Sequence, residues 1–429
     1  MTFPASFDSF TDRVAVIGLG YVGLPLAAAI ARSQPVLGFD IDAGRIGELR
    51  AGFDRTGEVS AEALAAVPNL APSCDPADLN GKSLFVVTVP TPVDSANKPD
   101  LGPLRAACAT IAPHLTPGAL IVFESTVYPG VTEDICGPLL AAGSGLRPGV
   151  DFELGYSPER INPGDKLHTI DRITKIIAGQ SARGVERLRA LYGPVTGDRL
   201  FVAADIRTAE AAKAIENAQR DINIAFVNEI AMICGRLGLS AQDVLAAART
   251  KWNFLDFTPG LVGGHCVAVD PYYLAQCAQD AGHEPEIILA GRRINDQMPL
   301  WIAERLDALL PRGARVLVLG LTFKENVPDL RNTRVIDLIQ GLTRAGHAVV
   351  VHDPLADPAE AKAHYGVTLA PDLPQETFDC LLGAVAHQGF RALTTEALVA
   401  RLTPAGLLAD LRGMWRDRLL PEQIRRWAL

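Results

Sequence analysis

The sequence predicts an α/β protein with two Rossmann-like doubly wound parallel-sheet domains, joined by a long central helix and a helical domain. Three observations predict this fold. Short apolar runs alternate with helical runs over residues 1–204, a proline-free helical run begins at Asp205, and residues 313–429 partly repeat the opening pattern. The helical part is therefore expected at 205–312.

Length and composition are those of an ordinary globular protein. The 429 residues are 48% hydrophobic and 21% charged, with a net charge of −9. The apolar runs are of strand length and no basic stripe is visible, so we expect neither a membrane nor a nucleic-acid partner. The seven cysteines are scattered without a CxxC pair, which indicates a cytoplasmic protein with no disulfide framework and no metal site.

The first motif is a dinucleotide fingerprint. Strand, glycine turn, helix, strand and acid follow in order at residues 13–18, 18–23, 24–32, 35–39 and 40. Gly18 permits the tight turn, Gly20 lets a pyrophosphate approach the backbone, and Gly23 lets the helix pack close to the strand. Asp40 is placed to bind the ribose hydroxyls of NAD and to repel the extra phosphate of NADP. The alternative is a tight glycine turn without a ligand.

Later strands end in polar residues. Strands are expected at 84–89, 119–123, 152–156 and 173–177. Thr91, Ser125, Thr126 and Glu159 come just after such ends, where ligands bind in open parallel sheets. The plainer interpretation of each is a capped or solvated loop residue.

A helix of unusual length is expected at 205–237. Lys213 and Asn217 are spaced i, i+4 and share one face of it. A solvated polar face commonly explains such a pair. The alanine- and isoleucine-rich flanks instead favour a packed helix, in which an ammonium and an amide aimed at one point make an oxyanion clamp. A second helix is expected after Ser240 as its N-cap.

A thiol lies in a glycine-rich loop at 251–270. Cys266 follows Gly263, Gly264 and His265, and Asp270 lies four positions on. A free thiol in such a loop can be activated by a nearby cation, for which Lys213 is a candidate. The alternatives are a packed cysteine and a structural or N-capping aspartate.

The last third of the chain repeats the strand-to-glycine pattern at 315–320 and the second strand with its acid at 348–353. The turn after Gly320 has no further glycine, so it is not expected to cradle a pyrophosphate. Lys324 and Arg331 follow in that loop as possible phosphate partners.

Together these motifs resemble the UDP-glucose/GDP-mannose dehydrogenase family. The matching segments cover nearly the whole chain and are residues 18–26, 88–92, 124–126, 157–160, 213 with 217, 263–271, and 323–331. The resemblance implies an NAD domain, a long helix used for dimerisation, and a UDP-binding C-terminal domain. Residues 251–265, with His265 before the cysteine and Arg160 after Glu159, are similar to the branch that acts on UDP-N-acetylhexosamines.

The resemblance also implies residue roles. The implied catalytic residues are Cys266, Lys213, Asn217, Glu159, Asp270 and Thr126. The implied cofactor contacts are Gly18, Gly20, Tyr21, Val22, Gly23, Asp40, Arg45, Pro90, Thr91, Ser125, Thr126 and Arg331. The implied substrate contacts are Arg160, Ile161, Asn162, Lys213, Asn217, Phe254, Gly260, Gly263, Lys324, Arg249 and Lys251. Arg249 and Lys251 are the two candidates for a basic residue that reaches across a dimer.

The activity so implied is an NAD-dependent four-electron oxidation of the C6 hydroxyl of UDP-GlcNAc or UDP-GalNAc, for surface polysaccharide biosynthesis. It would run through a cysteine thiohemiacetal and thioester in a cytoplasmic homodimer or dimer of dimers. The alternatives are a UDP-glucose 6-dehydrogenase, a single-hydride 3-hydroxyacid dehydrogenase, and a non-catalytic NAD- or UDP-sensing module.

Overall fold

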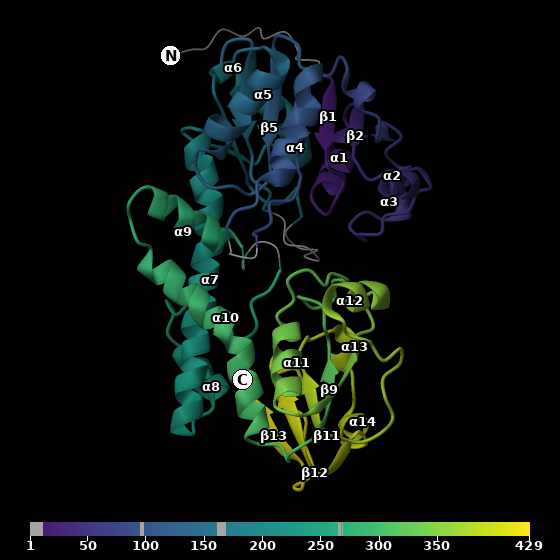
Figure 1. Cartoon of the computed structure of the whole chain (residues 1–429), viewed down its shortest axis with the longest axis vertical. Helices are drawn as coiled ribbons and strands as arrows, with labels where there is room; N and C mark the ends of the chain where they lie inside the picture. The colour runs from purple at the N-terminus through teal and green to yellow at the C-terminus, as the bar shows by residue number, and fades with distance from the viewer. Residues whose placement is uncertain (1–11, 95–97, 161–168, 265–266, 268) are drawn as a thin grey trace. The chain divides into compact units, whose positions relative to one another are not determined.

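The computed structural model describes residues 12–94, 98–160, 169–264, 267 and 269–429 (Figure 1). The chain forms two compact units. Unit 1 comprises the chain to Glu216 together with 272–281, and unit 2 comprises 217–271 and 282–429. Helices α7 (Ile206–Leu237) and α9 (Asp270–Asp280) have residues in both units. No helix among the described residues is both long and apolar enough to cross a bilayer.

Unit 1 is built on an eight-stranded sheet of order β3-β2-β1-β4-β5-β6-β7-β8. The strands are β1 (Val14–Ile17), β2 (Val36–Phe39), β3 (Leu70–Ser73), β4 (Leu84–Val87), β5 (Ala119–Phe123), β6 (Phe152–Tyr156), β7 (Lys175–Gly179) and β8 (Leu200–Val202). The strand order reverses between β1 and β4, which makes the carboxyl ends of these two strands the place for a ligand.

Helices cover both faces of this sheet, because successive side chains of its buried strands point to opposite faces and both faces are apolar. Ala15 and Ile17 belong to one core cluster with α4 and α5, whereas Val14 and Val16 belong to another with α1 and α6. The helical elements of unit 1 are α1 (Gly23–Ala31), α2 (Ala43–Arg50), α3 (Ala61–Ala65), η1 (Pro76–Leu79), α4 (Gly102–Ile111), η2 (Ala112–His114), η3 (Val131–Cys136), α5 (Gly137–Ser144) and α6 (Ala182–Thr196).

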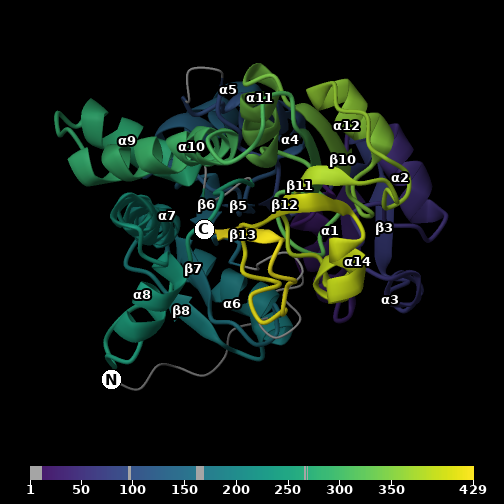
Figure 2. The same ribbon diagram turned by 90° about the horizontal axis from the view of Figure 1, so that it is seen from below.

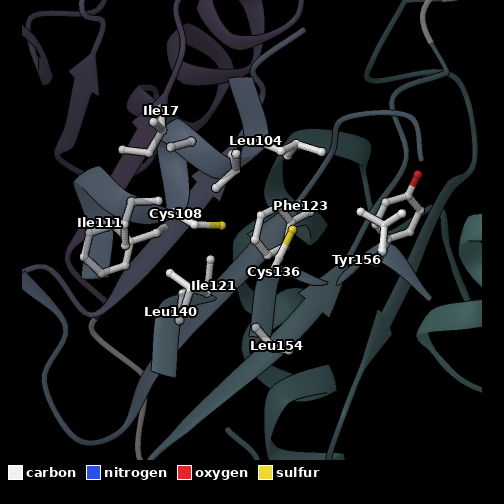
Figure 3. Close-up of a cluster of buried hydrophobic side chains, with 14 of the residues drawn as sticks. Ile17, Leu104, Cys108, Ile111, Ile121, Phe123, Cys136, Leu140, Leu154 and Tyr156 are labelled. Carbon is white, nitrogen blue, oxygen red and sulfur yellow. The ribbon is translucent and has the colours of Figure 1, made fainter. Parts of the chain in front are cut away.

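Two of the cysteines lie side by side inside the first of these clusters. Figure 3 shows the sulfur atoms of Cys108, on α4, and Cys136, in η3, facing each other among Phe123, Ile121 and Leu140. The hydrogen bond with Cys108, and burial, raise the pKa of the Cys136 thiol far above its usual range. Cys136 is therefore a core residue and not a nucleophile.

Unit 2 begins with a helical layer formed by the second part of α7 with α8 (Ala241–Ala248) and α10 (Glu286–Asp307). The Ser240 hydroxyl accepts the Asp243 N–H at 3.2 Å, so the predicted N-cap of α8 is confirmed. Met298, Ile302 and Leu306 of α10 are buried in the core of this unit.

The rest of unit 2 is a five-stranded parallel sheet of order β10-β9-β11-β12-β13. Helix α11 lies on one face and α14 on the other, as Figures 1 and 2 show. The elements are β9 (Arg315–Leu319), α11 (Val335–Arg344), β10 (Ala348–His352), α12 (Pro358–Tyr365), β11 (Phe378–Gly383), α13 (Gln388–Arg391), α14 (Thr395–Val399), β12 (Leu402–Asp410) and β13 (Arg425–Ala428).

The predicted α/β class with two parallel sheets and a long helix is confirmed, with one local difference. Strand β7 runs antiparallel to β6. An antiparallel neighbour needs no helical crossover, and the sequence from Ser157 to Gly164, with two prolines and one glycine, is poorly suited to form a helix.

Candidate active site

The glycine turn after β1 is shaped to admit a ligand. Gly18 has φ +94°, a conformation that favours glycine. A Cβ at Gly23 would collide with the Gly18 carbonyl oxygen, so only glycine lets α1 approach β1 this closely. A Cβ at Gly20, by contrast, would meet nothing within 4 Å. Among the described residues no side chain caps the first turn of α1, so a phosphate can bind at its N-terminus, where Tyr21 and Val22 lie.

Asp40 is held at the end of β2 beside this turn. Its Oδ2 accepts the Leu19 N–H at 2.8 Å and its Oδ1 accepts the Asp42 N–H at 2.9 Å. Each carboxylate oxygen keeps a further lone pair for a ribose hydroxyl. The geometry therefore fits the adenosine ribose of a dinucleotide.

Arg45 of α2 is anchored to the glycine turn. Its side chain is buried, Nε donates to the Leu19 carbonyl at 3.0 Å, and a terminal nitrogen pairs with Asp54 at 2.7 Å. Burial would raise the pKa of Asp54, but hydrogen bonds from Thr56, Val59 and Arg45 outweigh it and lower that pKa. The guanidinium thus supports the backbone of the glycine turn.

Polar groups gather at the carboxyl ends of β4 and β5. The Thr88 hydroxyl donates to the Gly18 carbonyl at 2.7 Å, and the Ser125 hydroxyl donates to the Val89 carbonyl at 2.6 Å. Tyr273 donates to the carbonyls of Thr91 and Pro92 at 2.7 and 2.8 Å. The predicted residues Pro90, Thr91, Ser125 and Thr126 therefore lie at one edge of one sheet.

Glu159 and Arg160 follow β6 at the same edge. Glu159 is half-buried, and its Oε1 accepts the Arg160 N–H at 2.6 Å. Arg160 pairs with Glu216 of α7 at 3.1 Å and donates to the Thr174 carbonyl at 2.8 Å. Ile161 and Asn162 lie outside the described residues.

Both predicted polar residues of α7 are buried. Lys213 is 6% exposed and Asn217 is 1% exposed, so the prediction of a packed rather than a solvated helix face is confirmed. The Asn217 amide donates to the carboxylate of Asp270, the first residue of α9, which is itself buried. Asp270 therefore orients Asn217 as well as beginning a helix.

The glycine loop that leads to Cys266 is held at both ends of its described part. The Asn228 side chain donates to the Gly260 carbonyl at 3.1 Å and accepts the Gly260 N–H at 2.8 Å. A Cβ at Gly263 or Gly264 would press on the Asn332 carbonyl or the Phe323 ring, at 2.6 and 2.8 Å. His265 and Cys266 lie outside the described residues.

Asn228 belongs to a buried polar network that the sequence analysis did not identify. Asn228 donates to Asn295 at 2.8 Å, and Asn295 donates to the Asp221 carboxylate at 2.8 Å. Arg292 pairs with Asp221 at 2.7 Å. Burial raises the pKa of Asp221, and Arg292 and Asn295 oppose that rise. The network fixes α10 to α7 and, through Asn228, fixes the start of the glycine loop.

The remaining predicted substrate contacts, and the predicted cofactor contact Arg331, belong to unit 2. Arg249 donates to the Phe257 carbonyl at 3.0 Å and pairs with Asp256 at 2.5 Å. Lys251 is exposed, Phe254 and Lys324 are half-buried, and the exposed Arg331 side chain forms an ion pair with Asp329 at 2.8 Å. Among the described residues no group of acids, cysteines and histidines is arranged to hold a metal ion.

Three family models match the chain in sequence. They are the NAD binding domain of the UDP-glucose/GDP-mannose dehydrogenase family at residues 12–196, its central domain at 207–297 and its UDP binding domain at 317–417. The chain belongs to this family. It is accordingly an NAD-dependent dehydrogenase.

Relatives within the family are similar over nearly their whole length. A UDP-N-acetyl-D-glucosamine 6-dehydrogenase of Pseudomonas aeruginosa is 48% identical, covering 93% of this chain and 96% of the relative. Protein CapL of Staphylococcus aureus is 46% identical, covering 97% and 99%. The structure of a UDP-D-ManNAc dehydrogenase from Pyrococcus horikoshii has a TM-score of 0.84 at 30% identity, covering 96% of this chain and 98% of that one.

Proposed function

We propose that this member of the UDP-glucose/GDP-mannose dehydrogenase family oxidises the C6 hydroxyl of a UDP-N-acetylhexosamine, UDP-GlcNAc or UDP-GalNAc, to the uronic acid. The observation that carries this proposal is 48% and 44% identity, over at least 93% of the chain, to two enzymes named UDP-N-acetyl-D-glucosamine 6-dehydrogenase. The fold adds a dinucleotide turn and a second parallel sheet that matches a UDP binding domain.

The chain fits NAD at the glycine turn of unit 1. The open space at Gly20, the uncapped start of α1 and the Asp40 carboxylate suit a pyrophosphate and a ribose diol. Bound NAD supplies the hydride acceptor for each two-electron oxidation. Thr91, Ser125 and Thr126 line the same sheet edge, where the nicotinamide half would lie.

Cys266 is our proposed nucleophile. Its thiolate adds to the C6 aldehyde to form a thiohemiacetal, which after the second oxidation is a thioester that water hydrolyses. Two facts support Cys266 over the other thiols. Its loop is glycine-rich and fixed at Gly260 and Gly264, and four of the cysteines in the described part of the chain, Cys108, Cys136, Cys234 and Cys380, are buried in the cores.

Lys213 and Asn217 are the proposed oxyanion partners. Asp270 takes one N–H of the Asn217 amide and so leaves the other in a fixed direction. An ammonium and a fixed amide N–H together stabilise the negative oxygen of a tetrahedral adduct by about 3 kcal/mol or more. Their burial keeps this stabilisation from being weakened by water.

Glu159, Thr126 and Asp270 are the proposed groups that move protons and place the hydrolytic water. The half-buried carboxylate of Glu159 lies at the sheet edge that also carries Thr126. A carboxylate in such a position can take a proton from the water that attacks the thioester. Arg160, Ile161, Asn162, Phe254, Gly260, Gly263 and Lys324 are proposed to hold the nucleotide sugar, with Arg249 or Lys251 reaching a neighbouring subunit.

The homodimer, the cytoplasmic location and a role in surface polysaccharide synthesis are parts of the same proposal. Phe226, Ile233 and Leu237 lie at compatible spacings on α7 and are 52%, 46% and 67% exposed. Such an apolar stripe on a long helix favours a second copy of the chain as its cover. We further propose that residues 1–204, 205–312 and 313–429 are the three functional parts.

A panel of UDP-sugars tests the proposal. We expect NADH release with UDP-GlcNAc or UDP-GalNAc at a kcat/KM at least about tenfold above that with UDP-glucose. Preference for UDP-glucose would favour the UDP-glucose 6-dehydrogenase, and no NADH with any UDP-sugar would contradict the proposal.

Two cysteine-to-serine variants test whether Cys266 is the nucleophile. Cys266→Ser should reduce acid formation on the order of 10³-fold, because the hydroxyl cannot capture the aldehyde as a thiolate does. Cys74→Ser, at an exposed thiol, is the matched control and should keep full turnover. Full turnover of Cys266→Ser would refute the covalent role.

A further inference from the structure

A buried ion pair lies directly behind the residues that we place at the sheet edge. Glu124, the first residue after β5, accepts Lys175 Nζ on Oε2 at 2.8 Å and the Tyr192 hydroxyl on Oε1 at 2.5 Å. Glu124 is 1% exposed, Lys175 is 4% exposed and Tyr192 is fully buried. Both carboxylate oxygens accept hydrogen bonds, so Glu124 is an anion facing an ammonium.

Stability alone does not explain this pair. A buried ion pair loses hydration on both partners, and well-packed apolar residues of similar volume often serve stability as well or better. The Lys175 ammonium also lies 4.8 Å from the centre of the Tyr192 ring, which holds it by a cation–π contact. Residues from β7 and α6 and from the position just after β5 therefore form one charge-balanced cluster.

The cluster is connected to Glu159 through Ser157. The Ser157 N–H donates to the carbonyl of Phe123, the residue before Glu124. The Ser157 hydroxyl donates to the carbonyl of Ile176, the residue after Lys175. Ser157 is buried and stands two residues before Glu159, so it ties the chain that leads to Glu159 to the neighbours of both partners of the pair.

The charges also interact. Burial raises the pKa of Glu124, Lys175 opposes that rise, and the Glu159 carboxylate adds to it. Burial and the Glu124 charge raise the pKa of Tyr192 well above its usual range. The carboxylates of Glu124 and Glu159 are therefore close enough to repel each other. Arg160, whose N–H donates to Glu159, and its ion-pair partner Glu216 on α7 are further charged groups near Glu159.

We propose that Glu124 and Lys175 are positioning residues for Glu159: through Ser157 the buried pair fixes the chain just before Glu159, and it places two opposite charges behind that residue. The inference rests on the proposed role of Glu159 in handling protons. Removing the negative charge should make the Glu159 carboxylate easier to ionise, and removing the positive charge should make it harder.

The pH profile of kcat/KM tests this with charge-neutral substitutions. Glu124→Gln leaves Lys175 uncompensated, so the acidic limb should move to lower pH by about one unit. Lys175→Met leaves Glu124 uncompensated, so the limb should move to higher pH by a similar amount. The double variant, which is neutral like the native pair, should return the limb close to its native position. Glu159→Gln identifies the limb by removing it.

Tyr192→Phe keeps the test decisive should a single charge variant fail to fold. Loss of the hydroxyl weakens the charged form of Glu124, so the limb should move in the same direction as with Glu124→Gln, by less. The inference would be overturned if Glu124→Gln and Lys175→Met moved the acidic limb of the kcat/KM profile in the same direction. It would also be overturned if no folded variant moved that limb. Wild-type protein that releases no NADH with any UDP-sugar would instead contradict the proposed function.

Discussion

The glycine turns at Gly18 in unit 1 and at Gly320 in unit 2 share the same backbone arrangement but differ in the space beside them. In unit 1, Asp40 accepts the Leu19 N–H at 2.8 Å, and in unit 2, Asp353 accepts the Leu321 N–H at 2.6 Å. Gly18 and Gly320 have φ +94° and +100°. Both acids therefore tie a second strand to the turn after a first strand.

The difference is what faces each turn. Beyond Gly18 the backbone is open at Gly20, where a Cβ would meet nothing within 4 Å. At Gly320 a Cβ would collide with Val385. In addition, the Asp353 carboxylate accepts a hydrogen bond from Nε2 of His387 at 3.1 Å. The His387 Nδ1 accepts the Asn326 N–H at 2.9 Å, so the histidine closes the second turn from inside. The same motif is thus open enough to suit a cofactor in unit 1 and is filled by side chains of the protein in unit 2.

The largest expected effect is at the filled turn. Gly320→Ala forces a Cβ against Val385 at a positive φ, and should lower the free energy of unfolding by about 3 kcal/mol. Urea denaturation measures this. Gly389→Ala, where a Cβ meets nothing within 4 Å, is the matched control in the same unit. Equal stability of the two variants would show that the second turn is as open as the first.

The acid of the filled turn should make unit 2 sensitive to low pH. Burial would raise the pKa of Asp353, but hydrogen bonds from His387 and from the Leu321 and Thr322 N–H groups lower it from 3.8 to about 2. A pKa that is lower in the folded than in the unfolded state stabilises the fold above about pH 4, by about 2 kcal/mol, and this stabilisation is lost as the pH falls toward 2.

Asp353→Asn tests that stabilisation by urea denaturation at several pH values. The variant should be less stable than wild type at pH 7, and the gap should narrow below pH 4. A gap that stayed constant down to pH 2 would contradict the lowered pKa.

The open turn should lose cofactor rather than stability. Gly20→Ala adds a methyl group where a pyrophosphate would approach, so the Kd for NAD should rise by about tenfold while Tm stays unchanged. Gly47→Ala, on α2 and also free of neighbours within 4 Å, should change neither. A Gly20→Ala protein that binds NAD normally would place the pyrophosphate elsewhere.

The smallest effect is on the choice between cofactors. Asp40→Asn removes the charge that repels a 2′-phosphate, so the ratio of NADP to NAD affinity should rise by about fivefold. Asp353→Asn should leave that ratio unchanged. A similar change in both variants would mean that the two acids share a role.

The sequence predicted the elements of the fold that depend only on neighbouring residues in the chain. Continuous apolar runs such as 119–123 and the proline-free stretch of α7 each need no knowledge of distant residues. The sheet-edge strand β3, Leu-Ala-Pro-Ser, was missed because its proline and short length resemble a turn. The antiparallel course of β7 depends on a pairing that no local pattern encodes.

The candidate site divides in the same way. Glycines and the acid at fixed spacing predicted the open turn, whereas no local pattern predicted the buried contacts of Arg45 with the Leu19 carbonyl and Asp54. Asn228 and Lys175 act through partners far along the chain, and a single asparagine in a helix or a lysine beginning a strand carries no signal of that. Only the folded chain brings such residues to Gly260 and Glu124.

Counting NADH tests the central claim most directly. A limiting amount of the preferred UDP-sugar is converted to completion with excess NAD, and NADH and sugar acid are both quantified. We expect two NADH for each uronic acid formed, because the alcohol is oxidised to the aldehyde and then to the acid. One NADH for each sugar consumed, with a carbonyl product, would contradict it.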